Sequence, residues 1–452
     1  MNSSEPIAQA NQPKATFTVI TGSAFHLSFR QLLKTLPQDY VGTLAGIQTR
    51  YGPLVHWRVM GGLMNFAFIS DARVNRELYV RHTDALEKSP SQVQTFLYAA
   101  GRSVATEHGE TWRTKRKEAN NLFSRQIIEA SCAGQVDVVR KFAKTLDKTP
   151  QDGLTISRKL AALTSSRGIL GRAISMEEAD AQIAFSQAAG ARFNTESAHL
   201  FARPNWMLAP WRKNLSRRKK DAFSIVDAAI TELRSSNKPN DGLMAHYVNG
   251  DFVTSSDNEM RTILVGLLLG AQDNIAAAVA WVLAYVSQDI PLQDQIRQEI
   301  SATDLGANAL NSCALLQATI AEILRLRPPA PANQPRILNQ NVELAGHTLP
   351  KGTYVFNSFY NMHHDAQVFP DPDAFAPHRF LNTTVSRSTS YAPFGHGPRN
   401  CVAQGMATQQ LAATLSGLLL GHRILPQQDG LPKTLQQPFL VPASFKVVAQ
   451  AI

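Results

Sequence analysis

Hydrophobic and polar positions alternate with a period of two close to the N-terminus of the chain. Residues 54–59 and 65–70 show this alternation, and Gly61-Gly62 lies between them. Two such runs around a glycine pair predict a β-hairpin. Short runs bounded by turn residues return over residues 328–355, and a strand-like tail covers residues 439–448. We therefore expect β-structure towards both ends of the chain.

Between about residue 71 and residue 301, most apolar positions recur at the helical period, as in residues 222–233 and 261–287. A proline-rich irregular stretch follows at residues 369–380, and a last helix is expected to begin near Cys401. No internal repeat or long low-complexity linker interrupts the chain. The predicted fold class is mainly α with a smaller β portion. We expect one large domain over residues 16–452 and a flexible tail over residues 1–15.

Composition and charge limit the class of protein. The chain has 452 residues, 44% of them hydrophobic, which is enough for a sizeable core. A net charge of +10 fits nucleic acid, a membrane surface or an acidic protein partner. The basic runs at residues 113–117 and 217–220 have no interleaved aromatic residues, which disfavours nucleic acid. We find no signal peptide and no uninterrupted apolar stretch of about 18 residues, so we expect a cytoplasmic protein without a membrane span.

The three cysteines, Cys132, Cys313 and Cys401, form no CxxC pair, and their odd number gives no disulfide framework. Only Cys401 lies in an unusual context, a loop with two glycines that is followed by a helix with small residues. A helix N-terminus favours a thiolate, and glycines let the backbone pass close to a flat group. From the residues alone, a small buried apolar side chain remains the commoner interpretation of a lone cysteine.

The full string Phe394-Gly395-His396-Gly397-Pro398-Arg399-Asn400-Cys401-Val402-Ala403 resembles the haem-binding loop of the cytochrome P450 family. The resemblance implies that Cys401 holds the iron of haem b as a thiolate. It also implies that the haem lies between this loop and a long central helix. Phe394, His396 and Arg399 are then expected to contact the cofactor.

Two further motifs occur in the family's order. Glu322 and Arg325 are spaced to share one helix face, in a segment that ends at Pro328-Pro329 and resembles the family's K-helix. The resemblance implies that this pair joins Arg379, of the Pro377-His378-Arg379-Phe380 segment, in a charged brace under the haem loop. His363-His364-Asp365 is assigned a structural role rather than a metal site.

Three residues elsewhere resemble the family's contacts to the haem propionates. Trp112 and Arg116 match the Trp-x-x-x-Arg pattern of the C-helix. Arg336 matches the arginine in the strand after the K-helix.

The stretch around Gly270 resembles the central I-helix, in which small residues open a groove above the iron. Gly270 and Ala271 provide the small pair and Asp273 the acid, but Asn274 stands where the family usually has threonine. An amide offers two donors and one acceptor, so Asn274 can still hold a water or a substrate group. Alternatively, it bonds only the Gly270 carbonyl.

The resemblance also implies a substrate pocket and an electron donor. The residues expected to line the pocket are Phe96, Tyr98, Leu268, Asn333, Gln334 and Phe439. They suggest a mostly apolar substrate with a polar handle, such as a fatty acyl, terpenoid or polyketide-like molecule of secondary metabolism. No flavin or nicotinamide fingerprint occurs, so the expected donor is a separate ferredoxin or flavodoxin with its reductase. Some charges of the run at residues 113–117 would then contact that acidic partner, and the enzyme is expected to be a monomer.

Three functions remain open at this point. The leading one is a monooxygenase that inserts one oxygen atom from O2. The second is a peroxygenase or an isomerase, which remains open because Asn274 replaces the usual threonine. The third is a non-catalytic haem sensor, against which the small residues Gly270 and Ala271 argue because they leave room for a ligand.

Overall fold

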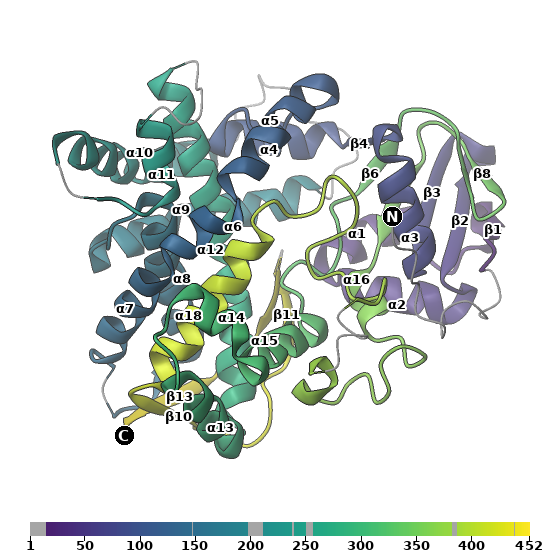
Figure 1. Ribbon diagram of the computed structural model, residues 1–452. Helices are drawn as coiled ribbons and strands as arrows, with labels where there is room; N and C mark the ends of the chain where they lie inside the picture. Colours follow the sequence, from purple (N-terminus) through teal and green to yellow (C-terminus); the bar gives the residue numbers. More distant parts are fainter. Residues whose placement is uncertain are drawn as a thin grey trace, which may run out of the picture.

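The computed structural model describes residues 15–146, 148–197, 211–236, 239–249, 256–381, 387–437 and 439–452. Helices fill one side of the molecule, and a sheet covered by α1, α2 and α3 forms the other side (Figure 1). The predicted flexible tail lies outside the described residues except for Ala15, which packs against a core cluster of the sheet.

The helices dominate the described residues, as the apolar period predicts. They are α1 (Phe29–Gln38), α2 (Tyr40–Tyr51), α3 (Ala72–Arg81), α4 (Pro90–Ala100), α5 (Gly109–Leu122), α6 (Arg125–Ala130), α7 (Cys132–Ala143), α8 (Gly153–Leu170), α9 (Met176–Ser197), α10 (Trp211–Ser235), α11 (Leu243–Val248), α12 (Asp257–Ser287), α13 (Ile290–Ser301), α14 (Ala307–Ser312), α15 (Ala314–Leu326), α16 (Phe359–His363) and α18 (Gln404–Leu419). Short 3-10 turns are η2 (Gly22–Ala24), η3 (Met60–Gly62), η4 (Thr83–Ala85) and η5 (Pro377–Phe380).

The largest sheet has six strands in the order β1-β2-β3-β9-β6-β4. Its strands are β1 (Thr18–Thr21), β2 (Leu54–Val59), β3 (Met64–Ile69), β4 (Leu86–Lys88), β6 (Arg336–Leu338) and β9 (Tyr354–Asn357). Strands β2 and β3 pair antiparallel across Gly61-Gly62, which confirms the predicted hairpin. The sheet thus joins segments from both ends of the chain, because β6 and β9 come after the helical region.

Smaller sheets complete the β portion. One sheet has three strands, β10 (His422–Pro426), β13 (Lys446–Ala451) and β5 (Gln151–Asp152). Two further sheets have two strands each. They are β11 (Thr434–Gln437) with β12 (Phe439–Pro442), and β7 (Val342–Leu344) with β8 (His347–Leu349). The predicted strand-like tail is therefore confirmed as two strands. The proline-rich stretch at residues 369–380 is irregular apart from η5, also as expected.

Helix α12 forms the centre of the largest hydrophobic core. From Ile275 to Ser287 every residue is buried, and the core around it also draws on α7, α8, α15 and α18. By length and composition alone α12 is apolar enough to cross a membrane, but 56% of its most apolar window is buried inside the protein. Since a core helix meets the same criterion, the prediction that the chain has no membrane span stays a prediction.

Trp281 fastens α12 to the C-terminal hairpin. Its side chain is fully buried, and its indole N–H donates to the Leu440 carbonyl at 3.0 Å. The guanidinium of Arg327 lies 5.2 Å from the centre of the indole ring. One side chain therefore connects the central helix, the hairpin and the end of α15.

We expect Trp281→Phe to lower the free energy of unfolding by about 1–3 kcal/mol, because the buried Leu440 carbonyl loses its donor. Urea unfolding of the holoenzyme measures this change. Leu63→Ala is the control, since Leu63 is 83% exposed and its change should stay within about 0.5 kcal/mol. Equal effects of the two substitutions would contradict the prediction.

Candidate active site

The loop before Cys401 owes its shape to two glycines with positive φ. Gly395 has φ +84° and Gly397 has φ +73°, conformations that L side chains rarely adopt. A Cβ at Gly397 would also clash with the carbonyl of Tyr79 in α3. The Cys401 N–H donates to the Phe394 carbonyl at 2.8 Å, which closes the loop. This turn delivers Cys401 just before α18, three residues ahead of its first residue, Gln404.

The surroundings of the Cys401 sulfur act in opposite directions on its pKa. Burial raises the pKa of the thiol, while the Ala403 N–H and the Arg116 guanidinium lower it, and the net pKa is raised. The N–H at the helix start thus favours the thiolate, as expected from the sequence, but burial outweighs its effect on the pKa. A metal would overcome the effect of burial, since a coordinating thiol is deprotonated outright.

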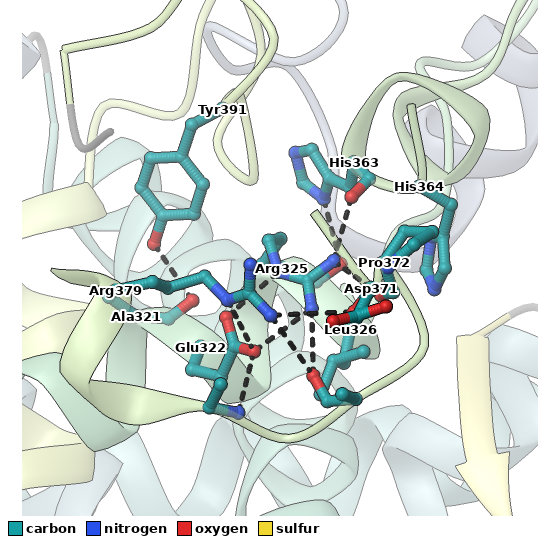
Figure 2. A network of polar contacts seen from close by, with 12 residues as sticks. Ala321, Glu322, Arg325, Leu326, His363, His364, Asp371, Pro372, Arg379 and Tyr391 are labelled. Carbon is teal, nitrogen blue, oxygen red and sulfur yellow. Dashed lines mark hydrogen bonds and ion pairs between the residues drawn. The ribbon is translucent and has the colours of Figure 1, made fainter. Parts of the chain in front are cut away.

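The brace of Glu322, Arg325 and Arg379 is complete in the structure (Figure 2). Arg325 donates from Nε to Glu322 at 2.8 Å and from Nη2 at 2.9 Å, and Arg379 donates to the same carboxylate at 3.0 Å. The side chains of Glu322 and Arg325 have no exposed surface. Arg325 also donates to the carbonyls of His363 and Pro372, so the pair organises the backbone ahead of the loop.

His363 carries this organisation to the cysteine loop. Its Nε2 accepts from the Ala392 N–H at 3.0 Å, so its Nδ1 is the donor to the Arg325 carbonyl, also at 3.0 Å. Burial is the main reason why the pKa of His363 falls to about 3, which keeps the ring neutral in this bridge. The structural role assigned to this histidine agrees with its contacts.

Two arginines supply donors that the protein itself leaves unused. The Nε and Nη1 of Arg336 and the Nε of Arg399 are buried and have no hydrogen-bond partner among the described residues. Arg399 stacks on Trp112, with its guanidinium carbon 4.0 Å from the ring centre. Buried unpaired donors are costly unless an acceptor arrives. Arg336 and Arg399, both expected from the sequence, therefore fit the carboxylates of a haem, and Trp112 packs against the guanidinium of Arg399.

Arg116 and His396 have other contacts. Arg116 donates to the carbonyl and the side-chain oxygen of Asn400, at 2.7 Å each, and so supports the loop next to Cys401. It keeps unused N–H groups, so a cofactor contact for it stays a prediction. His396 bonds Asn75 through Nδ1 and the Thr389 carbonyl through Nε2. With both ring nitrogens occupied and a pKa lowered to about 4 mainly by burial, His396 is neutral, and the predicted propionate contact is wrong.

On α12, Gly270, Asp273 and Asn274 line one cavity. A Cβ at Gly270 would meet no atom within 4 Å, so neighbouring protein atoms do not require this glycine. The Asn274 amide donates to the Gly270 carbonyl at 2.8 Å, which leaves its oxygen and one N–H for the cavity. Ala271 is not among the residues that line the cavity and packs against the core cluster, so the prediction that it opens the groove is wrong.

Asp273 is a mostly buried acid. Burial raises the pKa of its carboxyl, and the nearby Ser186 hydroxyl and Arg158 guanidinium lower it by less. The Ser186 hydroxyl lies outside hydrogen-bonding geometry and has no partner among the described residues. Asp273 thus holds a proton to higher pH than an ordinary aspartic acid.

The cavity has a volume of about 310 Å³. Phe96, Asn333, Gln334 and Phe439 line it, as predicted, but Tyr98 and Leu268 do not. The hydroxyl of Tyr98 bonds the Ser216 hydroxyl of α10 at 2.8 Å, so the side chain points away. Leu268 lies on the face of α12 that meets α9 and α10, and both predictions are therefore wrong.

One wall of the cavity, formed by α9, was not predicted from the sequence. Ser186, Ala189, Gly190 and Phe193 of α9 all line it, at the spacing i, i+3, i+4 and i+7. Phe193 packs edge-on against Phe96, with ring centres 4.7 Å apart. The pattern of small residues on one helix face was visible in the sequence, but it usually marks close helix packing.

We expect Glu322→Gln to lower the free energy of unfolding by about 3–5 kcal/mol, because Arg325 stays buried without its counter-charge. Denaturant titration of the holoenzyme measures this loss. Asp137→Asn is the matched control, since it removes a carboxylate from an exposed pair with Lys141 that should contribute less than about 1 kcal/mol. A small change for Glu322→Gln would show that the brace does not stabilise the fold.

Comparisons with known proteins agree with this geometry. The cytochrome P450 family profile matches residues 24–447. The chain is 25% identical over 431 residues to 25-hydroxyvitamin D-1 alpha hydroxylase, mitochondrial, of Mus musculus, covering 87% of this chain and 84% of the relative. It is 25% identical over 445 residues to steroid 17-alpha-hydroxylase/17,20 lyase of Cavia porcellus, covering 87% and 86%.

A solved structure described as retinoic acid bound cyanobacterial CYP120A1 has the same fold, with a TM-score of 0.76 and 19% identity over 93% of this chain and 96% of that chain. The sequence resemblance, the brace and the unpaired donors that suit haem carboxylates thus agree with the family match. This chain belongs to the cytochrome P450 family, and it is a haem-dependent monooxygenase.

Proposed function

We propose that this enzyme inserts one oxygen atom from O2 into an uncharged, mostly apolar small molecule. We further propose that it takes electrons from a separate ferredoxin or flavodoxin. The charge of the cavity is the main support for an uncharged substrate. Of the described residues that line it, none is Lys, Arg or His, and Asp273 is the one acid. A carboxylate substrate would therefore lose its hydration there without gaining a cationic partner.

The polar lining of the cavity supports a substrate with a polar handle. Asn333 and Gln334 lie in the turn after α15, and Asn274 and Ser186 face the cavity from the opposite helices. Two relatives are named for hydroxylating vitamin D and a steroid, which are mostly apolar molecules with few polar groups. A neutral alicyclic or terpenoid molecule fits this combination better than a fatty acid does.

The haem, when bound, supplies the activation of dioxygen. The chain's own task is to bring protons to the cavity and to exclude bulk water. Burial raises the pKa of the Asp273 carboxyl, which favours its protonated form, and the free N–H and oxygen of Asn274 can position a water or a substrate hydroxyl beside it. Asn274 makes a bond to the carbonyl four residues earlier, as a threonine hydroxyl also does in helices. This similarity supports ordinary O2 chemistry in spite of the substitution.

A second hollow, lined in part by Cys401 itself, suits a protein partner. It is lined by parts of α5, α6 and α18, and Arg116, Arg125 and Gln404 lie along it. The basic run of α5 contributes fewer charges than expected, because Arg113 pairs with Asp84 and Glu110, and Lys115 pairs with Glu259. The expected acidic partner, the monomeric state, the cytoplasmic location and a role in secondary metabolism stay predictions.

The second candidate is a peroxygenase, or an isomerase that needs no external electrons. Asn274 favours it, since an amide is a weaker proton donor than an acid or an alcohol paired with one. The haem-sensor hypothesis is disfavoured because a sensor has no need of a 310 Å³ cavity with a buried acid.

The test combines two oxidants with two variants at position 274. Purified holoenzyme is given uncharged terpenoids and steroids, and fatty acids for comparison, either with O2 and reduced ferredoxin or with hydrogen peroxide alone. We expect product from the neutral compounds with O2 and reduced ferredoxin. Asn274→Ala should lower the product formed per reduced cofactor consumed severalfold, and Asn274→Thr should retain it.

Product from peroxide alone, and none with O2 and reduced ferredoxin, would replace the proposal by the peroxygenase. Preferential oxidation of the fatty acids would contradict the substrate class. If Asn274→Ala formed as much product per reduced cofactor consumed as the wild type, Asn274 would have no role in oxygen activation.

We expect Asp273→Asn to be more stable and less active than the wild type at pH 7. Since the folded state raises the pKa of Asp273, it binds the proton more tightly than the unfolded state does. Stability is therefore lost as the pH rises from the unfolded pKa of about 3.9 through the folded pKa, and Asn avoids this loss. Turnover should fall about a hundredfold, as is typical when a proton donor is removed.

Urea unfolding at pH 3 and pH 7 and steady-state turnover measure the two effects. The stability difference should be present at pH 7 and nearly absent at pH 3. A difference of the same size at both pH values would show that it does not come from the carboxyl charge.

A further inference from the structure

Lys88 is a basic residue that the sequence analysis did not connect with the cofactor. It ends strand β4, and its partner across the antiparallel ladder is Arg336 of β6. Directly opposed residues point to the same face of a sheet, and like charges in such a pair are destabilising. Arg336 is one of the residues with buried, unpaired N–H groups. An anion between the two side chains would offset their repulsion and would accept hydrogen bonds from the unpaired N–H groups of Arg336.

Lys88 also holds the connection between α4 and α5. Its ammonium donates to the Val104 carbonyl at 3.3 Å and to the Ala105 carbonyl. These carbonyls belong to a turn closed by the Thr106 N–H bond to the Ser103 carbonyl at 2.9 Å. In the sequence, the connection lies between Phe96 of α4, which lines the cavity, and Trp112 of α5, which stacks on Arg399. One ammonium thus contacts a loop that links both parts of the active site.

The electrostatic surroundings of Lys88 are strongly positive. Burial, followed by Arg336 and Arg399, lowers the pKa of Lys88 to about 7, and Glu107 opposes this fall. The pKa of His108 is lowered by burial and then by Lys88, Arg399 and Arg336, with Glu87 acting in the other direction. Lys88, His108, Arg336 and Arg399, the basic cluster, therefore lie within electrostatic reach of one another. Glu107, Glu87 and Asp84 act in the opposite direction on Lys88, His108 and Arg399, but the pKa of each of these three basic groups remains lowered.

We propose that Lys88 couples occupancy of the haem site to closure of the 101–108 loop: it shares the cofactor's carboxylates with Arg336 and Arg399, and it holds the Val104 and Ala105 carbonyls at the same time. A carboxylate keeps the ammonium charged, and a charged ammonium makes stronger bonds to carbonyls than a neutral amine. Without that anion, repulsion within the basic cluster weakens the hold on the loop. Lys88 is a positioning residue in this scheme.

Lys219 provides a matched control inside the same chain. Its ammonium also donates to a backbone carbonyl, that of Tyr98 at 3.0 Å, and burial also lowers its pKa. No arginine contributes to that shift. Lys88→Met removes two lysine–carbonyl contacts in the connection after α4, and Lys219→Met removes one contact to a carbonyl within α4. Only the first substitution removes a member of the basic cluster.

The first experiment measures haem transfer from each holoenzyme to a haem-acceptor protein, and amide hydrogen exchange with and without haem. In the wild type, haem should slow the exchange of residues 101–108. Lys88→Met should lose haem on the order of tenfold faster and should lose most of this haem-induced protection. Lys219→Met should keep the wild-type haem loss and the haem-induced protection. Unchanged haem loss and protection in Lys88→Met, or equal changes in both variants, would overturn the proposal.

The second experiment uses the wild-type chain and so does not depend on whether Lys88→Met folds. The protein is reconstituted with haem dimethyl ester, whose carboxylates are blocked while its iron remains available to Cys401. We expect the ester to leave residues 101–108 exchanging almost as fast as in the protein without haem. Full protection of these residues by the ester would show that the carboxylates do not close the loop.

Discussion

The buried ion pair between Glu322 and Arg325 is the interaction on which the rest of the structure depends. Neither side chain has exposed surface, so the pair is tolerable only because its hydrogen-bonding capacity is used. Arg379 and the Ala376 N–H donate to the carboxylate of Glu322. Arg325 donates to the carbonyls of Pro372 and Ala374 in the proline-rich stretch. A stretch that lacks regular secondary structure thereby gains a defined path. Through His363 and the Ala392 N–H, that path ends at the loop that presents Cys401.

Helix α12 combines two opposed requirements. Its C-terminal half is buried on all sides and forms the core, whereas Gly270, Asp273 and Asn274 face a cavity. Burying the Asp273 carboxyl raises its pKa and destabilises the folded state at neutral pH, yet the same burial lets this carboxyl hold a proton to higher pH than an exposed aspartic acid does. The stability lost here is offset by the extensive apolar burial further along the same helix.

The sequence predicted those parts of the site that depend on local backbone geometry. The two glycines and the short run up to Cys401 form one loop, and the prolines around Asn333 and Gln334 direct a turn into the cavity. The sequence did not predict contacts that depend on the rotation of a helix about its axis or on a partner far away in the chain. Tyr98, Leu268 and Ala271 lie on helices whose apolar faces meet two neighbours, so the period alone does not say which face is lined by solvent or ligand. His396 was misassigned because its partner Asn75 comes from α3, far away in the sequence.

The two arginine-rich regions differ in how their charges are satisfied, and this difference explains why the protein needs its cofactor. Arg325 donates from all three of its guanidinium nitrogens to protein acceptors, so the brace is complete within the polypeptide. Arg336 is also buried, with 8% of its surface exposed, but two of its nitrogens have no partner among the described residues. Lys88 lies directly across the strand ladder from it. A polypeptide could have placed a glutamate there, as it did at position 322. Because two nitrogens of Arg336 have no partner among the described residues, a dianion bound there would stabilise the folded state.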